Sequence, residues 1–227
     1  MVLVHAETPY HHGNLRAALL ERAEAVLASQ GADSLSLRGL ARDLGVSHAA
    51  PGRHFRDRRA LLDALAVTGF HRLNERMRAE ADTPGPVTDR LAGLGRAYVD
   101  FAVAHAPLLS LMFTAKHADE STPELRELGH RSLEIAAGLI ADAQREGAVR
   151  AGDPVRLAQV AFSTLHGLAL LAVGSLLEDT PLPEATELAL DVLLTGLAAG
   201  PPTPADPPTP AVTDAPAPPH PDATAGA

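Results

Sequence analysis

Apolar side chains recur along most of the chain three or four residues apart, the spacing of one face of an α-helix. The first such stretch, 14–30, is interrupted by Gly31. A shorter stretch runs from Ser36, a good N-cap, to residue 44, and Gly45 is expected to end it with a positive φ. Pro107 precedes a short helical piece, LLSLMF. Further helices are predicted at 58–81, 87–105, 123–146, 154–177 and 183–199.

No alternating strand pattern competes with these helices, so the fold class is expected to be all-α. Prolines stand at the starts of the later helical stretches or between them, where helices tolerate them. The end of the chain, 201–227, holds ten prolines and no lysine or arginine, and it is expected to be a disordered tail. We therefore divide the chain into a head (1–57), a helical body (58–199) and a Pro-rich tail (200–227).

The stretch SHAAPGRHF, 47–55, is unusual because Pro51 and Gly52 are poor residues for a helix interior. If Ser47 caps a helix, Pro51 lies only about four residues into it, where the first-turn amides have no intrahelical partner. Pro51 and Phe55 then face inward, one turn apart, and Arg53 faces outward. Together with the preceding helix and its glycine turn, the stretch fits a helix-turn-helix. Such hairpins also occur in proteins that bind no DNA.

Charge is distributed unevenly along the chain. The net charge of −9 argues against nucleic acid, but residues 1–60 hold eight arginines against six acidic residues, a formal charge of +2 with five histidines. The rest of the chain therefore carries −11. A mildly basic head on an acidic body is compatible with a nucleic-acid-binding module.

Three motifs, YHHGNL (10–15), SLRGLARDLGVSHAAPGRHF (36–55) and RRALLDAL (58–65), resemble the N-terminal domain of the TetR family of bacterial transcription regulators. The body resembles, more weakly, the subgroup whose sensor domain carries Trp-His-Gly, with Leu165 in place of the tryptophan. The resemblance implies a cytoplasmic homodimer, most simply a repressor that binds a palindromic DNA operator and is released by a small apolar effector. A protein-binding module that has lost DNA binding is the alternative.

By position, the resemblance also implies DNA-contacting residues. The family usually has an aromatic residue where this chain has Gly52, so we expect Gly52→Tyr to tighten DNA binding. His11 and His12 are further candidates for phosphate contacts. The residues expected to face bases are Arg38, His48, Ala49, Ala50 and Arg53, and those expected at phosphates are Ser36, Ser47, His54 and Arg58.

The body carries aromatic and histidine residues at helical spacing. They are candidates for the wall of an effector cavity, although such a stripe also occurs in an ordinary core. The candidates are Tyr98, Phe101, His105, Met112, Phe113, Phe162 and His166. A second set on the last two predicted helices fits an intersubunit four-helix bundle or packing within one subunit, and the sequence does not separate the two. Its members are Val160, Gly167, Leu171, Gly174, Leu188, Val192 and Leu193.

Other classes of protein find little support in the sequence. The chain has no cysteine, no Gly-rich phosphate loop, no Gly-x-Ser-x-Gly and no His-Glu-x-x-His motif, so we expect neither an enzyme nor a metal site or other cofactor. No secretory signal is visible, and the longest apolar stretch, 167–177, is far shorter than the roughly 20 residues that span a bilayer. We therefore expect no membrane partner.

Overall fold

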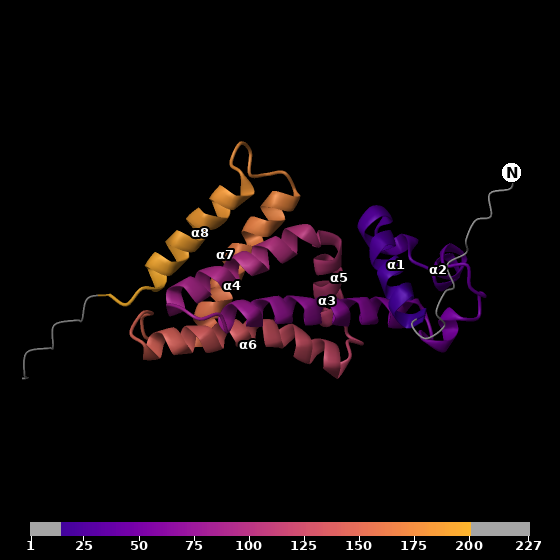
Figure 1. Ribbon diagram of the computed structural model, residues 1–227, viewed down its shortest axis with the longest axis horizontal. Coiled ribbons are helices and arrows are strands. Elements are labelled where there is room, and N and C mark those ends of the chain that lie inside the picture. The colour runs from indigo at the N-terminus through magenta and orange to yellow at the C-terminus, as the bar shows by residue number, and fades with distance from the viewer. Residues whose placement is uncertain (1–14, 201–227) are drawn as a thin grey trace, which may run out of the picture.

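The computed structural model describes residues 15–200, which form helices and one isolated β-bridge, between Val149 and Ala198. The predicted all-α fold is confirmed for this part of the chain (Figure 1). The predictions for His11, His12 and the Pro-rich tail concern residues outside it. The helices are α1 (Leu15–Gln30), the 3₁₀-helix η2 (Ala32–Ser34), α2 (Leu37–Asp43), the 3₁₀-helix η3 (Pro51–Arg53), α3 (Arg58–Ala81), α4 (Val87–Ala104), α5 (Ala106–His117), α6 (Pro123–Arg145), α7 (Pro154–Val173) and α8 (Leu182–Leu197).

Side-chain caps explain why several helices begin where they do. Ser36, Asp57, Thr122 and Asp153 each accept a hydrogen bond from a backbone amide in the first turn of the helix that follows. These caps satisfy amides that have no intrahelical partner. Prolines occupy the first turns of α6 and α7, where no backbone donor is required.

The long helix α3 joins the two halves of the molecule. Its 24 residues correspond to about 36 Å at 1.5 Å per residue. One end packs against α1, and the rest is surrounded by α4, α5 and α6 (Figure 1). Buried residues of α1, α3 and the body helices form one continuous apolar core. Gly69 permits the close crossing of α3 and α5, because a Cβ there would lie 2.5 Å from Sδ of Met112.

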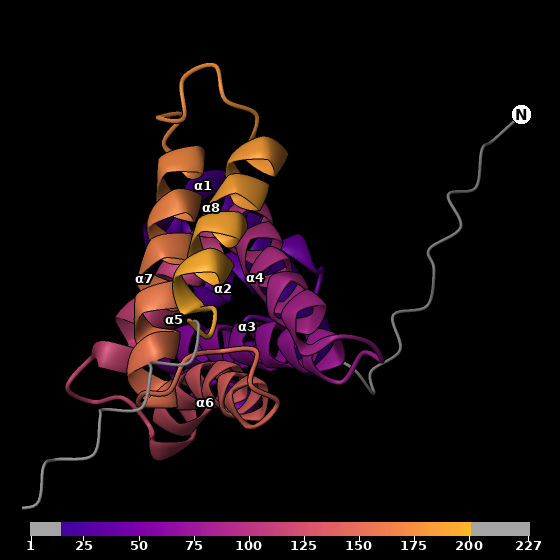
Figure 2. The ribbon, with the colours of Figure 1, turned by 90° about the vertical axis from the view of Figure 1, so that its left-hand side faces the viewer.

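The chain bends by 100° between α4 and α5, and α7 and α8 form a hairpin at the end of the body away from the head (Figures 1 and 2).

Two of the helix ranges predicted from the sequence were wrong. The piece after Pro107 is a 12-residue helix, α5, rather than the six residues LLSLMF. Helix α7 ends at Val173 instead of residue 177, with Gly174 as its C-cap. Ser175, with a φ of 57°, then starts the loop to α8.

Candidate nucleic-acid interface and ligand cavity

The head presents a short helix, a glycine turn and a second short element. Gly45 has a φ of 66°, as predicted, which a residue with a side chain rarely adopts. The amide of Val46 donates to the carbonyl of Ala41 at 3.0 Å, which closes the end of α2 in the manner of a Schellman turn. The inward-facing Ala41, Pro51 and Phe55 are buried and hold the second element against α1 and α2.

The second element is not the regular α-helix predicted from Ser47. Residues 47–50 form turns, and the 3₁₀-helix η3 follows. Pro51 explains the difference, because it has no N–H to donate to the carbonyl four residues back. Successive bonds instead span three residues, such as Ala50 to Ser47 at 2.9 Å and Arg53 to Ala50 at 3.2 Å. Among the hydrogen bonds between described residues, none involves the Ser47 hydroxyl, so its expected capping role is not seen.

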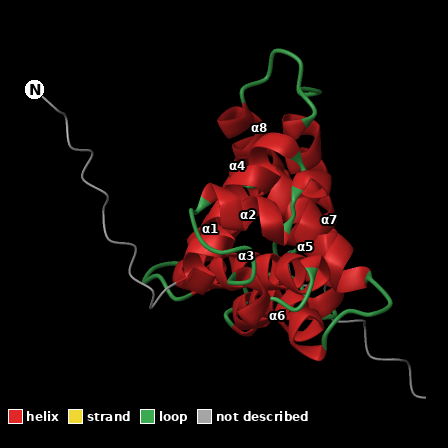
Figure 3. Cartoon of the chain, turned by 90° about the vertical axis from the view of Figure 1, so that its right-hand side faces the viewer, coloured by secondary structure: helices red, strands yellow, loops and turns green. Residues whose placement is uncertain are grey.

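The outward face of the head carries small side chains between cations. Arg38, His48, Ala49, Arg53 and His54 are exposed. The head, with α1 and α2, forms the end of the molecule that faces the viewer in Figure 3. Ala50 is half-buried, and Ser36, Ser47 and Gly52 are exposed. Nearby, Asp43 is neutralised by Arg22, with an Nη2–Oδ2 distance of 2.9 Å.

Arg38 and Arg53 form no ion pair with any residue between 15 and 200. The outward face therefore holds two cations without counter-ions. The side chains beside them are small and project little from the backbone. Such a surface can lie close to an anionic, grooved partner.

Arg58, a predicted phosphate contact, is engaged inside the head. Its Nε donates to the carbonyl of Leu35 at 3.0 Å, and its Nη2 donates to the carbonyl of Ala32 at 2.7 Å. The second guanidinium nitrogen also lies 3.6 Å from Oδ1 of Asp33. Arg58 thus ties the start of α3 to the connection between α1 and α2. The sequence offered no sign of this role, because the carbonyls that Arg58 contacts lie more than 20 residues away.

A cavity of about 350 Å³ lies in the body between α3, α4, α5, α6 and α7. Of the predicted wall residues, Tyr98, Phe113 and Phe162 line it. The other lining residues were not predicted as wall residues from the sequence, because they come from several helices and share no motif. They are Phe70, Leu73, Met77, Leu94, Lys116, His117, Gly129, His130, Ser132, Leu133, Ala136, Ala158, Gln159, Ala161 and Leu165.

An aromatic cluster separates this cavity from a second one of about 270 Å³, which is lined by His166 and shares Phe113 with the first. The hydroxyl of Tyr98 lies 2.7 Å from Nδ1 of His166, and Phe162 stacks on the His166 ring with centroids 5.2 Å apart. Burial raises the pKa of Tyr98 and lowers the pKa of His166. Both groups are therefore held neutral, and the Tyr98 hydroxyl can donate to the imidazole.

Three predicted wall residues lie elsewhere. Phe101 and Met112 are fully buried and line neither cavity, so their helical spacing reflects the core. His105 sits between the head and the body, where its Nδ1 lies 3.7 Å from Oε1 of Glu24. Burial and the neighbouring Arg72 lower the pKa of His105.

The candidates for a subunit interface lie mostly on one exposed surface of α7 and α8, the hairpin that faces the viewer in Figure 2. Val160, Leu188 and Val192 have 61, 63 and 62% of their surface exposed. A group of large apolar side chains exposed together is informative, whereas a single one is not. Leu171 is also exposed, Leu193 is half-buried, and a Cβ at Gly167 would meet open space. By length and composition α7 is apolar enough to cross a bilayer.

Two family models match the chain. The model described as "Bacterial regulatory proteins, tetR family" matches residues 19–65, and "Tetracyclin repressor-like, C-terminal domain" matches residues 91–214. The first covers the helix-turn-helix, and the second covers most of the body. No functionally curated protein matches the chain.

Solved structures share this fold over nearly their whole length. A protein of unknown function from Rhodococcus sp. RHA1 is 48% identical, with a TM-score of 0.79 over 85% of this chain and 100% of its own. The TetR family transcriptional regulator PfmR from Thermus thermophilus is 18% identical, with a TM-score of 0.65 over 78% and 97%. The ketosteroid transcriptional regulator KstR2 of Mycobacterium tuberculosis is 19% identical, with a TM-score of 0.63 over 86% and 99%.

Proposed function

This chain belongs to the TetR family of bacterial transcriptional regulators, and we propose that it is a repressor that binds a palindromic operator as a dimer. In this proposal the head, 1–57, binds DNA, and the body, 58–199, forms the dimer and holds a small apolar effector whose binding releases the operator. The family generally acts by binding DNA rather than by catalysis, and we assign no reaction to the cavity.

The observation that carries the proposal is the outward face of the head, where Arg38 and Arg53 have no acidic partner among the described residues and stand beside small residues. An arginine fork matches the acceptors of guanine in the major groove, and alanine methyls fit against thymine methyls. We assign base contacts to Arg38, His48, Ala49, Ala50 and Arg53, and phosphate contacts to Ser36, Ser47 and His54. Arg58 we assign instead to holding the head together.

The exposed apolar side of α7 and α8 supports a dimer. A soluble protein rarely exposes contiguous large apolar residues unless a partner covers them. If a second copy places its own α7 and α8 against this surface, the four helices form a bundle. Such a bundle also accounts for the apolar composition of α7 without a membrane. Two heads held on one rigid dimer are what a palindromic operator requires.

The position of α3 supports a link between cavity and head. Phe70, Leu73 and Met77 of α3 line the cavity, while the first turns of the same helix hold the helix-turn-helix. An effector that shifts α3 would change the spacing of the two heads. A coupling free energy of about 1–3 kcal/mol would lower operator affinity about 5- to 150-fold.

The test is fluorescence anisotropy with DNA from directly upstream of the protein's own gene, titrated at several salt concentrations. We expect salt-dependent, sequence-specific binding that Arg53→Ala weakens and makes less selective. Arg131→Ala, which removes an equal charge from the exposed side of α6, should leave binding unchanged. Absence of salt-dependent binding to this DNA and to selected random sequences would contradict the proposal and favour a protein-binding module.

A further inference from the structure

Lys116 is the chain's one lysine among 19 lysine and arginine residues, and it lines the large cavity. Its side chain is half-buried at the last turn of α5, and its Nζ donates to the carbonyl of Gly129 on α6 at 3.0 Å. Gly129 makes this position possible, because a Cβ there would clash with Cδ of the lysine. The ammonium group is therefore held at the cavity wall between two helices.

No described carboxylate lies within 4.0 Å of Lys116. Burial lowers its pKa, with no acidic neighbour to oppose the shift. A carbonyl satisfies one of three ammonium donors and leaves the charge unpaired. A partly buried cation of this kind is stabilised by an anion that brings its own charge into the site.

The rest of the wall matches an anion with an apolar body. None of the lining residues is acidic, and His117, His130 and Gln159 add further potential donors. The remaining wall is mostly aliphatic and aromatic. The hydroxyl of Ser132 donates to Oδ1 of Asn74 at 2.6 Å, so it offers its lone pairs rather than its proton to the cavity.

We propose that the effector is an apolar carboxylic acid whose carboxylate is bound by Lys116 and whose hydrocarbon body lies between α4, α6 and α7. The proposal rests on the cavity being the effector site of the proposed function, and it adds the chemical class of the effector. Lys116 would then select anionic ligands over neutral ones of the same length, because a neutral head group leaves the partly buried charge uncompensated.

Isothermal titration calorimetry without DNA tests this selection, with decanoate and decanol as probes that share one chain length. We expect the wild-type protein to bind decanoate about tenfold or more tightly than decanol, because a hydrogen bond between an ammonium and a carboxylate is stronger than one between an ammonium and a neutral hydroxyl. Lys116→Met keeps a long unbranched side chain and should remove that preference while sparing decanol. Arg131→Met, which removes an equal charge outside the cavity, should leave both affinities unchanged.

A second measurement uses the unsubstituted chain. Reductive methylation with ¹³C-formaldehyde gives a single dimethyl-lysine resonance, and decanoate but not decanol should raise the pKa of that amine. Equal affinities for the two probes, a decanoate preference that survives Lys116→Met, or binding of neither probe would overturn the proposal. Operator binding is measured without any ligand, so the DNA-binding part of the proposed function stands or fails separately.

Discussion

At the scale of single residues, Gly52 lies exposed on η3, and a Cβ there would meet no heavy atom within 4 Å beyond the adjacent residues and the backbone of η3 itself. We predict that Gly52→Tyr tightens operator binding about tenfold. A tyrosine hydroxyl adds a hydrogen bond to a phosphate, and loss of glycine's backbone freedom stabilises η3 in the head by up to about 1 kcal/mol. Anisotropy at fixed salt measures the change.

The variant Gly52→Ala separates these two contributions, because it stiffens the backbone without adding a hydroxyl. An affinity for Gly52→Tyr that is unchanged or weaker than that of wild type would show that η3 does not approach a phosphate at this point.

Arg58 allows a prediction that distinguishes a structural role from a DNA contact. Its guanidinium donates to the carbonyls of Ala32 and Leu35. Because the side chain is 44% exposed, we expect Arg58→Met to destabilise the protein by about 1 kcal/mol, less than a fully buried charged bond would contribute. Urea unfolding measures that loss. The slope of log DNA affinity against log salt concentration should equal that of wild type. A slope reduced by about one would instead support the phosphate contact predicted from the sequence.

His166 should make stability depend on pH. Its pKa in the fold is lowered by burial below the ordinary value of 6.5, so at mildly acidic pH the unfolded chain binds more protons than the folded one. The stabilisation is therefore complete above about pH 6.5 and decreases as the pH falls below it. His105 has a shift of the same sign and adds to the effect.

We predict that the loss of unfolding free energy between pH 7.5 and 5.5 is smaller in His166→Gln, whose amide can still accept from Tyr98. Thermal or urea unfolding at the two pH values gives the comparison. An equal loss in wild type and variant would mean that His166 does not titrate differently on folding.

At the scale of helices, the hairpin of α7 and α8 carries the prediction about assembly. Val160→Glu and Val192→Glu should each convert the dimer to a monomer, because a glutamate would be buried without a cation in the bundle. The folded monomer should be little affected, since both side chains are more than 60% exposed in it. Analytical ultracentrifugation measures the assembly. Ala79→Glu, at an exposed position of α3, is the control, and a dimer that survives both interface variants would place the interface elsewhere.

The helices show how far the sequence determines this fold. Local sequence signals predicted the bounds of α1, α2 and α3 well. Ser36 caps α2, Gly45 follows its end, and α3 spans the predicted 58–81. The second element of the helix-turn-helix differed because a single missing amide at Pro51 changes its hydrogen bonding. The cavity was predicted only through its aromatic residues. Lys116 and Gly129 were not identified, because only the packing of α5 on α6 brings them together.

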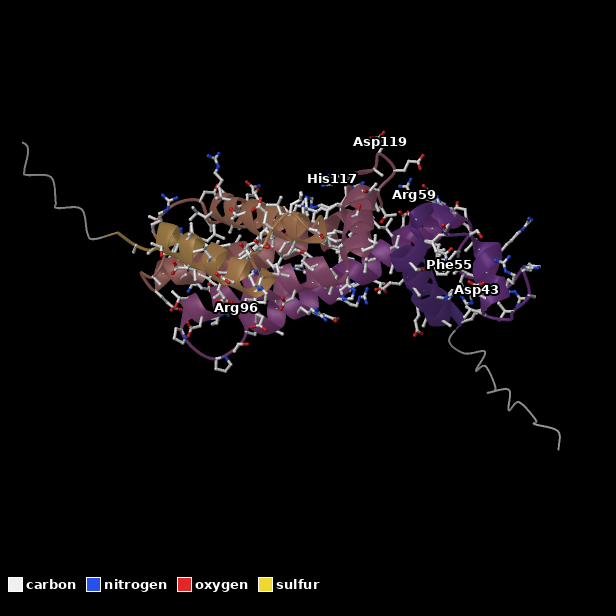
Figure 4. The ribbon with its side chains drawn as sticks, turned by 90° about the horizontal axis from the view of Figure 1, so that it is seen from above. Asp43, Phe55, Arg59, Arg96, His117 and Asp119 are labelled. Carbon is white, nitrogen blue, oxygen red and sulfur yellow. The ribbon has the colours of Figure 1, made fainter. Side chains whose placement is uncertain are left out.

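At the scale of the whole molecule, ion pairs join the head to the body beside the shared core. Arg72 of α3 contacts Glu24 of α1 at 2.8 Å, and His105 lies near the same carboxylate. Within the body, Arg59 in the first turn of α3 contacts Glu120 of the loop between α5 and α6 at 3.1 Å, where Figure 4 labels Arg59 close to Asp119. The contacts of Glu24 connect α1 to α3 and to the junction of α4 and α5, so they are placed to transmit a change in the cavity to the head.

Glu24 therefore provides a test of the coupling itself. We predict that Glu24→Gln reduces the factor by which decanoate lowers operator affinity, because the head is then held less firmly to the body. Binding equilibria are reciprocal, so the factor by which operator DNA lowers decanoate affinity must decrease equally. Anisotropy gives the first factor and calorimetry with operator duplex gives the second.

The matched control is Asp142→Asn, which removes an equal charge from an exposed ion pair with Arg145 at the far end of α6. It should leave both factors unchanged. If Glu24→Gln lowers operator affinity but preserves both factors, Glu24 only stabilises the head, and the signal from the cavity must pass through α3 and its apolar contacts alone. If both factors fall together, the contact between α1 and α3 belongs to the part of the molecule whose conformation the effector and the operator shift in opposite directions.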